Sequence, residues 1–227
     1  MKIESIQVGM PTAYYQGEQS AIHKQVVHGP VHVAYDNLSG DKQADLSVHG
    51  GRDKAVYVYP REHYSYWQQP VGLLRTARLK LPDNPCGSFG ENLTLSGLTE
   101  DNVYIGDTFS CGDVILQVTQ AREPCWKLAL KFKQKKLVLW VISSGYTGWY
   151  MRVLQQGEIS AGMPLTRVEQ GCTDWSVRHC NQLYHAKKLN RDKLQSVLAC
   201  AALSESWRVS FTKRLAYYDQ HATSAGD

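Results

Sequence analysis

The sequence of 227 residues predicts an α+β protein that is mainly β, followed by a small unit of three helices. Residues 1–171 consist mostly of short apolar, strand-like runs separated by loops. Residues 172–220 instead contain three short amphipathic stretches, each preceded by a helix-capping residue. We therefore expect a β domain at 1–171, a helical unit at 172–220 and a disordered tail at 221–227.

Two runs in the first half of the chain are typical of strands. Residues 31–35 show the alternating pattern of a strand whose two faces have different environments. Residues 55–59 form a β-favouring run long enough for a buried strand. Proline is favoured at the first position of a helix. Pro60 therefore predicts a helix that begins directly after the second strand, with Tyr64 and Trp67 on one face.

The second half of the β domain is predicted to contain a hairpin. Gly106 and Gly112, each followed by an aspartate, mark turns before residues 108–110 and 114–119, whose spacing favours two antiparallel strands. Residues 126–132 then favour a helix. Residues 148–155 are also predicted to be helical and to end before a glycine, and residues 158–168 are predicted to form a strand pair.

The predicted helical unit has recognisable capping residues. Thr173, Asn190 and Ser204 each precede an amphipathic stretch, and all three residue types accept hydrogen bonds from the first turn of a helix. Trp207 and Phe211 are spaced by four residues and share a helix face. The unit either docks a partner, such as an electron donor or a second copy of this chain in a homodimer, or covers a sheet edge.

Composition limits the classes of function. The net charge of +4 permits an anionic ligand but does not call for nucleic acid. The N-terminal residues lack the apolar core of a signal peptide, and no apolar run reaches membrane-spanning length, so a cytoplasmic location with no membrane partner is expected. The six cysteines form no Cys-x-x-Cys pair, and in a reducing cytosol we expect no disulfide.

Cys125 is the cysteine with the most unusual setting. An apolar strand ends near Thr119, and a short charged loop leads to Pro124, which suits the first turn of a helix. The backbone N–H groups at a helix start, together with Arg122 and Lys127, favour a thiolate. A thiolate ligates metals and attacks electrophiles. The alternative is a buried, inert cysteine, which is common in proteins.

A pair of glycines forms a second candidate site. Gly50 and Gly51 let the backbone approach a ligand closely, and they are flanked by His49 and Lys54, whose side chains can donate to phosphate or another oxyanion. Consecutive glycines mark an ordinary tight turn more often than a binding site. Both interpretations stay open from these residues alone.

Glu91 and Asn92 form a third candidate site between a glycine-containing loop and a strand. The Asn92 amide can donate and accept hydrogen bonds, as the edge of a heterocycle requires. The commoner alternative is a pair that bonds to its own loop. A nearby lysine cluster is best explained as a solvated helix face; it comprises Lys131, Lys133, Lys135 and Lys136.

Taken in order, these segments resemble the MOSC domain family, named after the C-terminal domain of molybdenum cofactor sulfurases, and in particular its YiiM-type bacterial branch. The matching motifs are His49-Gly50-Gly51 with Lys54-Ala55-Val56, Tyr59-Pro60-Arg61-Glu62-His63-Tyr64 with Trp67, Phe89-Gly90-Glu91-Asn92-Leu93, Val103-Tyr104-Ile105-Gly106-Asp107, and Arg122 with Pro124-Cys125. The resemblance covers nearly the whole chain, including the helical tail. It implies a β-barrel-like domain with peripheral helices.

The resemblance also implies a cofactor, molybdenum bound to molybdopterin, with Cys125 as the protein ligand to the metal. The residues carried over as cofactor contacts are Lys24, His49, Gly50, Gly51, Lys54, Asn92 and Arg122. These supply glycine backbone, amide and cationic donors, which suit the phosphate and the pterin edges of such a group. Cys125, His49 and Glu91 are the candidate catalytic residues, the last two as proton donors.

The activity implied by the resemblance is reduction of N-hydroxylated compounds, such as N-hydroxylated purines and hydroxylamine-type molecules, which detoxifies base analogues. The chain contains no flavin or iron–sulfur motif, so electrons would come from a separate reductase protein. Two alternatives use the same thiolate. One is a binding module that carries the molybdenum cofactor without turnover, and the other is a sulfur carrier that holds a persulfide on Cys125.

Overall fold

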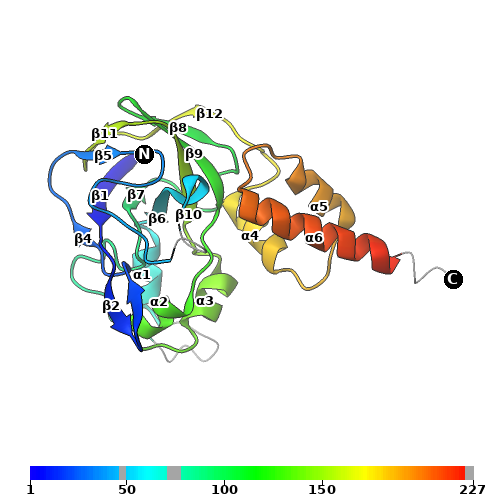
Figure 1. Cartoon of the computed structure of the whole chain (residues 1–227), viewed down its shortest axis with the longest axis horizontal. Coiled ribbons are helices and arrows are strands. Elements are labelled where there is room, and N and C mark those ends of the chain that lie inside the picture. The colour runs from blue at the N-terminus through cyan, green and yellow to red at the C-terminus, as the bar shows by residue number, and fades with distance from the viewer. Residues whose placement is uncertain (46–49, 71–77, 223–227) are drawn as a thin grey trace.

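The computed structural model describes residues 1–45, 50–70 and 78–222. Its main element is an eight-stranded sheet that curls into a half-barrel, with strand order β12-β8-β9-β10-β6-β7-β1-β4 (Figure 1). These strands are β1 (Lys2–Val8), β4 (Gln25–Val26), β6 (Val56–Pro60), β7 (Leu93–Ser96), β8 (Thr108–Cys111), β9 (Val114–Ala121), β10 (Trp149–Gln155) and β12 (Thr166–Glu169). Strands β6 and β7 pair in parallel, and the other neighbours pair antiparallel.

Two small two-stranded sheets and four short helices complete the described part of the barrel domain. The small sheets pair β2 (Thr12–Tyr15) with β3 (Glu18–Ser20) and β5 (Val31–Val33) with β11 (Gly157–Ile159). The helices are the 3₁₀ turn η1 (Arg52–Lys54), α1 (His63–Gln68), α2 (Trp126–Lys131) and α3 (Leu137–Ser144). In the part of the chain that the structure describes, no helix is long and apolar enough to cross a membrane.

Several sequence predictions for the strands are confirmed. Strands β8 and β9 form the expected antiparallel hairpin, and β6 occupies the run predicted at 55–59. Helix α1, however, begins at His63 rather than at Pro60. Pro60 still pairs with Leu95 of β7, and the backbone N–H of Arg61 donates to Leu95 O at 2.8 Å. The hydrogen bonding between β6 and β7 therefore continues one residue past the proline.

The predicted helix at 148–155 is wrong, because this segment is strand β10 at the centre of the sheet, between β9 and β6. Trp149, Met151 and Val153 are buried while the residues between them are partly exposed, which is the two-residue period of a strand. The strand pair expected at 158–168 is also wrong, since β11 pairs with β5 and β12 pairs with β8.

The C-terminal unit consists of three helices, as predicted: α4 (Val177–His185), α5 (Arg191–Leu198) and α6 (Glu205–Ala222). Asn190 caps α5 by accepting from Lys193 N, and Ser204 accepts from Trp207 N in the first turn of α6. The prediction for Thr173 is wrong, because Ser176 caps α4 instead. Helix α6 reaches Ala222, two residues into the segment expected to be a disordered tail.

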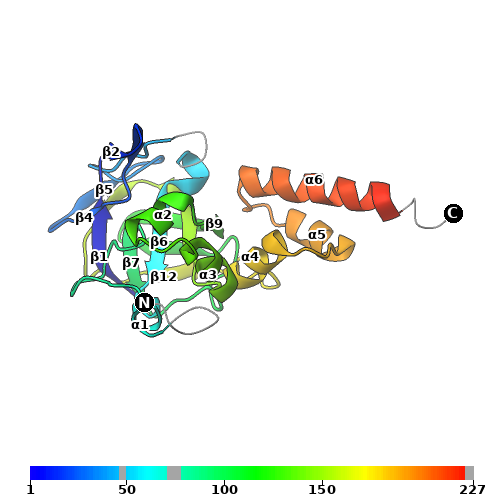
Figure 2. The same ribbon diagram turned by 90° about the horizontal axis from the view of Figure 1, so that it is seen from below.

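The helical unit shares a core with the half-barrel. Val177 and Cys180 of α4 and Trp207 and Phe211 of α6 are fully buried in the same apolar cluster as the sheet residue Val118. The first turn of α6 lies against the barrel while the C-terminal end of the helix projects away from it (Figures 1 and 2). The unit therefore covers part of the barrel, and the prediction that it also docks a partner stays a prediction.

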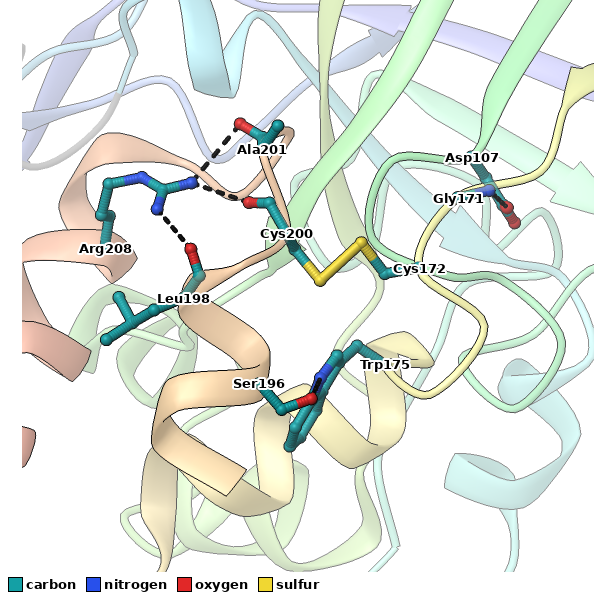
Figure 3. The surroundings of a disulfide bond; sticks show 9 residues. All are labelled: Asp107, Gly171, Cys172, Trp175, Ser196, Leu198, Cys200, Ala201 and Arg208. Atoms are coloured by element: carbon teal, nitrogen blue, oxygen red, sulfur yellow. Dashed lines mark hydrogen bonds between the residues drawn. A yellow bond between two sulfur atoms is a disulfide. The ribbon is translucent and has the colours of Figure 1, made fainter. Parts of the chain in front are cut away.

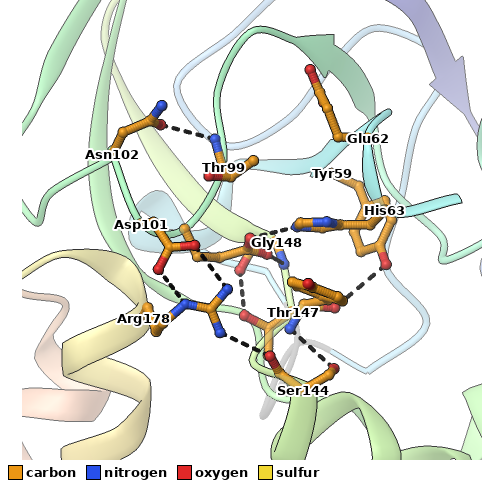
Figure 4. Close-up of polar contacts among 12 residues, drawn as sticks. Tyr59, Glu62, His63, Thr99, Asp101, Asn102, Ser144, Thr147, Gly148 and Arg178 are labelled. Atoms are coloured by element: carbon orange, nitrogen blue, oxygen red, sulfur yellow. Dashed lines mark hydrogen bonds and ion pairs between the residues drawn. The ribbon is translucent and has the colours of Figure 1, made fainter. Parts of the chain in front are cut away.

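A polar network also ties α4 to the barrel (Figure 4). The Arg178 guanidinium forms a two-point ion pair with Asp101, and its Nη1 donates to Ser144 O at 2.8 Å. Nearby, Gly148 N donates to the buried Glu100 carboxylate at 2.7 Å, and Glu100 also pairs with His63 Nε2 at 2.6 Å. The network thereby fixes Gly148 just before β10, and Gly148 O in turn accepts from the backbone N–H of Arg122 in the Cys125 loop.

The expectation that no disulfide forms is wrong. Cys172 and Cys200 are joined by a disulfide between the segment before α4 and the end of α5, with their Cα atoms 6.1 Å apart (Figure 3). Beside it, Trp175 Nε1 donates to Ser196 Oγ at 2.9 Å, which draws the same two segments together. Folding of the helical unit thus brought together two cysteines that are 28 residues apart in the sequence, a pairing invisible in local spacing.

Candidate functional site

Cys125 lies where the sequence placed it, at the start of a helix that follows a barrel strand. Strand β9 ends at Ala121, and Cys125 is the extended N-cap residue of α2, with φ −107° and ψ 167°. Pro124 stands one residue before the cap rather than in the first turn. The thiol is half-buried, so it is reachable from solvent while held by a fixed backbone.

Arg122 carries a polar atom that the protein itself leaves without a partner. The side chain is 5% exposed, and its Nη1 makes no hydrogen bond. The guanidinium lies 5.3 Å from the centre of the Tyr57 ring. The backbone N–H of Arg122 donates to Gly148 O at 3.1 Å. Burial by itself would lower the pKa of Arg122, but electrostatic interactions with Tyr57, Tyr150 and Cys125 outweigh the effect of burial and raise this pKa. The group is a buried cation with an unused donor.

The thiol and this guanidinium line one cleft, which we call the first cleft, with a free volume of about 660 Å³ including its open mouth. Most of the predicted site residues meet here: Lys24, Gly50, Lys54, Asn92, Arg122 and Cys125. The remaining lining residues are Ser20, Ala21, Ile22, Lys42, Gln43, Ala44, Asp45, Tyr57, Phe89, Gly90, Lys127 and Tyr150. Residues more than a hundred positions apart thus converge on one pocket.

The glycine pair has a structural role as well as a place near the cleft. Gly50 and Gly51 have φ values of 105° and 81°, which side chains with a Cβ rarely adopt. Gly51 caps η1, and its carbonyl accepts from Lys54 N at 2.9 Å, so a tight turn is present as the simpler interpretation required. Gly50 lines the first cleft and Gly51 does not. His49 lies outside the described residues.

Lys24 and Asn92 are held at the wall of the cleft by Asp41, a carboxylate that the sequence analysis missed. Asp41 is buried, forms an ion pair with Lys24, and accepts from Asn92 Nδ2 at 3.0 Å and from Gly9 N at 2.7 Å. The Asn92 Oδ1 also accepts from Tyr57 N at 3.1 Å. Burial lowers the pKa of Lys24, and Asp41 opposes that change. Asn92 therefore organises this wall of the cleft.

Glu91, a candidate proton donor, lies outside the first cleft. The side chain is fully buried and is absent from the lining of the first cleft. Its carboxylate accepts from Gly87 N at 2.6 Å, from Phe89 N at 3.0 Å and from the Tyr64 hydroxyl. These bonds close the loop before β7, which is the local role that the alternative interpretation anticipated.

Lys131 is not the freely solvated side chain that its lysine-rich segment suggested. Its Nζ donates to Ile22 O at 3.1 Å and Gly87 O at 3.2 Å. Burial lowers the pKa of Lys131 to about 8; Glu91 opposes the change, whereas the nearby charges of Arg122 and Lys24 add to it. Lys127 is also buried, with Nζ donating to Gln19 O at 2.7 Å. Positive charge is thus concentrated behind the cleft.

Lys131 predicts a pH dependence of stability. Because its pKa is about 8 in the fold and 10.5 ordinarily, the unfolded chain binds more protons between these values, and the contribution of Lys131 to folding becomes more favourable as pH rises from 8 to 10.5. The melting temperature of the wild type should therefore rise relative to Lys131→Met across this window. Lys135→Met, at an exposed position, is the control. A constant difference across the window would contradict the assignment.

Tyr57 and Tyr150 are further cleft residues that sequence reasoning missed. They come from β6 and β10, and their rings lie 5.4 Å apart. Burial raises the pKa of both phenols, while Arg122 opposes that rise. Both phenols are therefore neutral hydrogen-bonding groups at physiological pH. The sequence carried one signal for Tyr150: the alternating pattern of residues 149–155, read as a strand, places Tyr150 on the face opposite Trp149.

The donor set of the first cleft fits an anionic cofactor that brings its own sulfur ligands to a metal. Arg122 Nη1 is a buried donor lacking a partner, and such an atom costs free energy unless a ligand accepts from it. Cys125 supplies one thiol beside it. Among the described residues no three His, Cys, Asp or Glu side chains gather as metal ligands. A group that needs one protein thiolate and several cationic contacts matches these residues.

Replacing Arg122 with Met is expected to weaken cofactor binding much more than it affects stability. The free energy of unfolding of the cofactor-free protein should change little, because Met removes the unpartnered Nη1 donor together with the Tyr57 contact that offsets the burial of the cation. Cofactor affinity should fall at least about 30-fold, since a lost charge-assisted contact costs about 2 kcal/mol or more. Urea unfolding and molybdenum content measure the two effects.

The matched control is Arg152→Met. Arg152 pairs with Asp53 at 2.8 Å and donates to Ala202 O at 2.9 Å, away from the first cleft. This variant should lose stability and keep the cofactor. Full cofactor retention in Arg122→Met would contradict the role assigned to Arg122.

Known protein families match both parts of the chain. The MOSC domain model matches residues 45–166, and the YiiM-like 3-alpha helix domain model matches residues 175–216. The chain is 43% identical to the YflK protein of Bacillus subtilis (strain 168) over 92% of each chain. It is 35% identical to a reductase of Gibberella moniliformis over 77% of this chain and 30% of that longer protein.

A solved structure shows the same architecture. The crystal structure of YiiM from Geobacillus stearothermophilus matches with a TM-score of 0.77 and 38% identity, covering 94% of this chain and 98% of that one. MOSC domains are associated with the molybdenum cofactor. With both of its parts matched by family models, the chain belongs to the MOSC domain family, in the branch that carries the YiiM-like three-helix domain.

Proposed function

We propose that this protein is a molybdenum-cofactor-dependent reductase of N-hydroxylated compounds, among them N-hydroxylated purines and hydroxylamine-type molecules. The observation that carries the proposal is that the Cys125 thiol and the Arg122 guanidinium, whose Nη1 has no partner, line one cleft of a MOSC domain. The reductase of Gibberella moniliformis among its relatives supports reductive chemistry.

Four lining residues of the first cleft have tasks in this proposal. Cys125 holds the metal through Sγ, and Arg122 binds the anionic part of the cofactor through Nη1. Lys24, kept in place by Asp41, and Lys54 add positive charge to the same wall. The cofactor, when bound, supplies two-electron redox chemistry. The protein supplies its position and its electrostatic environment.

The proposed reaction is balanced by two electrons and two protons. The N–O bond of R–NHOH breaks, the nitrogen gains a proton to give R–NH2, and the oxygen leaves as water. The electrons come from a separate reductase protein, since the chain has no flavin or iron–sulfur motif. Detoxification of base analogues follows, because the N-hydroxyl group that alters base pairing is removed.

The test is to purify the protein from a host that makes the molybdenum cofactor, and to measure its metal, its pterin and its turnover of an N-hydroxylated purine with an artificial reductant. Metal and pterin with turnover would support the reductase. Metal that passes to an acceptor apoenzyme without turnover would contradict it and indicate a cofactor carrier. A cyanide-labile sulfur without metal would contradict it and indicate a persulfide carrier on Cys125.

A further inference from the structure

A second cleft lies on the other side of Cys125, with a free volume of about 1210 Å³ including its open mouth. It shares Asp45, Lys54, Cys125, Lys127 and Tyr150 with the first cleft, so the two spaces meet at the thiol. Its remaining lining residues are Glu18, Gln120, Glu123, Pro124, Trp126, Tyr184, Ser206 and Ser210. A molecule in this space would lie next to whatever Cys125 holds.

One wall of the second cleft belongs to the C-terminal helices. Tyr184 comes from α4, and Ser206 and Ser210 come from α6. The Tyr184 ring stacks on the buried Trp207 ring, with centroids 4.4 Å apart and planes 12° from parallel. Stacking on a buried side chain restricts the phenol to one orientation. This wall is therefore preformed, as ligand sites usually are.

The same wall is fastened to the Cys125 loop. Trp207 Nε1 donates to Glu123 Oε1 at 2.7 Å, two residues before Cys125, and Ser206 Oγ donates to Gln120 Oε1 at 3.0 Å. The position of Tyr184 relative to the thiol is consequently fixed by direct contacts between the helical unit and the barrel. The packing of the helical unit against the barrel therefore both covers part of the barrel and forms one wall of the second cleft.

The chemistry of the lining selects a particular kind of molecule. Trp126, on the barrel side, is 48% exposed and lines this cleft. Together with Tyr184 it offers aromatic surface for a flat ring. The Ser210 hydroxyl donates to Ser206 O at 2.9 Å, and Glu123 and Ser210 interact with the Tyr184 hydroxyl, so these three side chains offer mainly acceptor oxygens to the N–H groups of a ring amine. Burial together with Glu123 raises the pKa of Tyr184, which keeps the phenol protonated.

We infer that the second cleft is the substrate subsite, and that Tyr184 and Ser210 of the helical unit select flat heteroaromatic amines. The inference rests on the proposed reductase function and adds the residues that bind the ring of its heteroaromatic substrates. The N-hydroxylated nitrogen faces Cys125, and the ring lies between Trp126 and the helical wall. A molecule as small as hydroxylamine reaches the thiol side without touching Tyr184 or Ser210.

Two variants of cofactor-loaded protein test the subsite. Tyr184→Phe removes one hydroxyl, and Ser210→Leu fills the cleft. The dissociation constant of adenine, the amine that reduction of an N-hydroxylated adenine releases, should rise about tenfold in Tyr184→Phe, as expected for one lost hydrogen bond, and by more in Ser210→Leu. The kcat/KM for hydroxylamine should fall less than the kcat/KM for an N-hydroxylated adenine in both variants. Calorimetry measures the first quantity and reductase assays the second.

Matched controls lie on α6 outside the cleft: Tyr217→Phe, at a side chain 57% exposed, and Thr212→Leu, at an exposed position. Both should bind adenine as the wild type does. Unchanged adenine binding in Tyr184→Phe and Ser210→Leu, or no binding by the wild type, would overturn the subsite. Adenine binding that these variants weaken, without reduction of any N-hydroxylated substrate, would leave the subsite standing and contradict the reductase function.

Discussion

Replacing Cys125 with Ala is expected to lower reductase activity more than about 100-fold and to reduce the molybdenum content of the purified protein. Loss of groups that merely orient a metal ligand typically costs 10–100-fold, so loss of the ligand itself should cost more. The fold should survive, because the side chain is half-buried and makes no capping hydrogen bond to α2. Metal analysis and an assay with an N-hydroxylated purine provide the two measurements.

Cys86→Ala is the matched control for this experiment. Cys86 is also a half-buried thiol, but it lines neither the first nor the second cleft. Burial raises the pKa of Cys86, so this thiol stays protonated at neutral pH, unlike a metal ligand. Its replacement should leave metal content and turnover unchanged. Full activity in the Cys125 variant would rule out Cys125 as the ligand.

Replacing Gly148 with Ala is expected to destabilise the protein by about 4 kcal/mol. Gly148 has φ +67°, and a Cβ there would overlap Val58 O and lie 2.9 Å from Tyr57 Cε2. The left-handed backbone costs an alanine about 1–3 kcal/mol, and overpacking adds a similar amount. For a chain of this size the melting temperature should fall by about 10 °C or more.

Gly162→Ala separates the two contributions to that loss. Gly162 also has positive φ, +91°, but no heavy atom lies within 4 Å of a Cβ built there. This variant should lose only the backbone term, about 1 kcal/mol. Equal melting temperatures for the two variants would show that Gly148 is not held against β6. Because Gly148 O accepts from Arg122 N, the Gly148 variant should also lose cofactor.

Local sequence signals predicted those parts of the fold that depend on a few neighbouring residues. Asn190 and Ser204 were recognised as caps because capping is completed within three residues of the cap itself. The hairpin of β8 and β9 was predicted because its turn glycine lies between its two strands. The setting of Cys125 was readable for the same reason, since strand, loop and helix start follow one another directly.

Errors arose where tertiary contacts decide the conformation. Residues 148–155 form a strand because β9 and β6 flank them and hydrogen-bond to them, which outweighs any local preference for a helix. For Glu91 the residue type alone allows a chemical role, and its role as a proton donor stays a prediction. Only the folded chain shows it fully buried and bonded to its own loop.

By itself, the sequence determined the mainly β first part, the three C-terminal helices, the caps Asn190 and Ser204 and the thiol at the start of a helix, because each depends on contacts between near neighbours. The tertiary structure alone decided that Tyr57 lies under Arg122, that Asp41 holds Lys24, and that Cys172 meets Cys200. It also decided that the second cleft lies between the barrel and the C-terminal helices. These features require residues distant in sequence to meet in space, and their positions follow from packing of the whole core rather than from any local pattern.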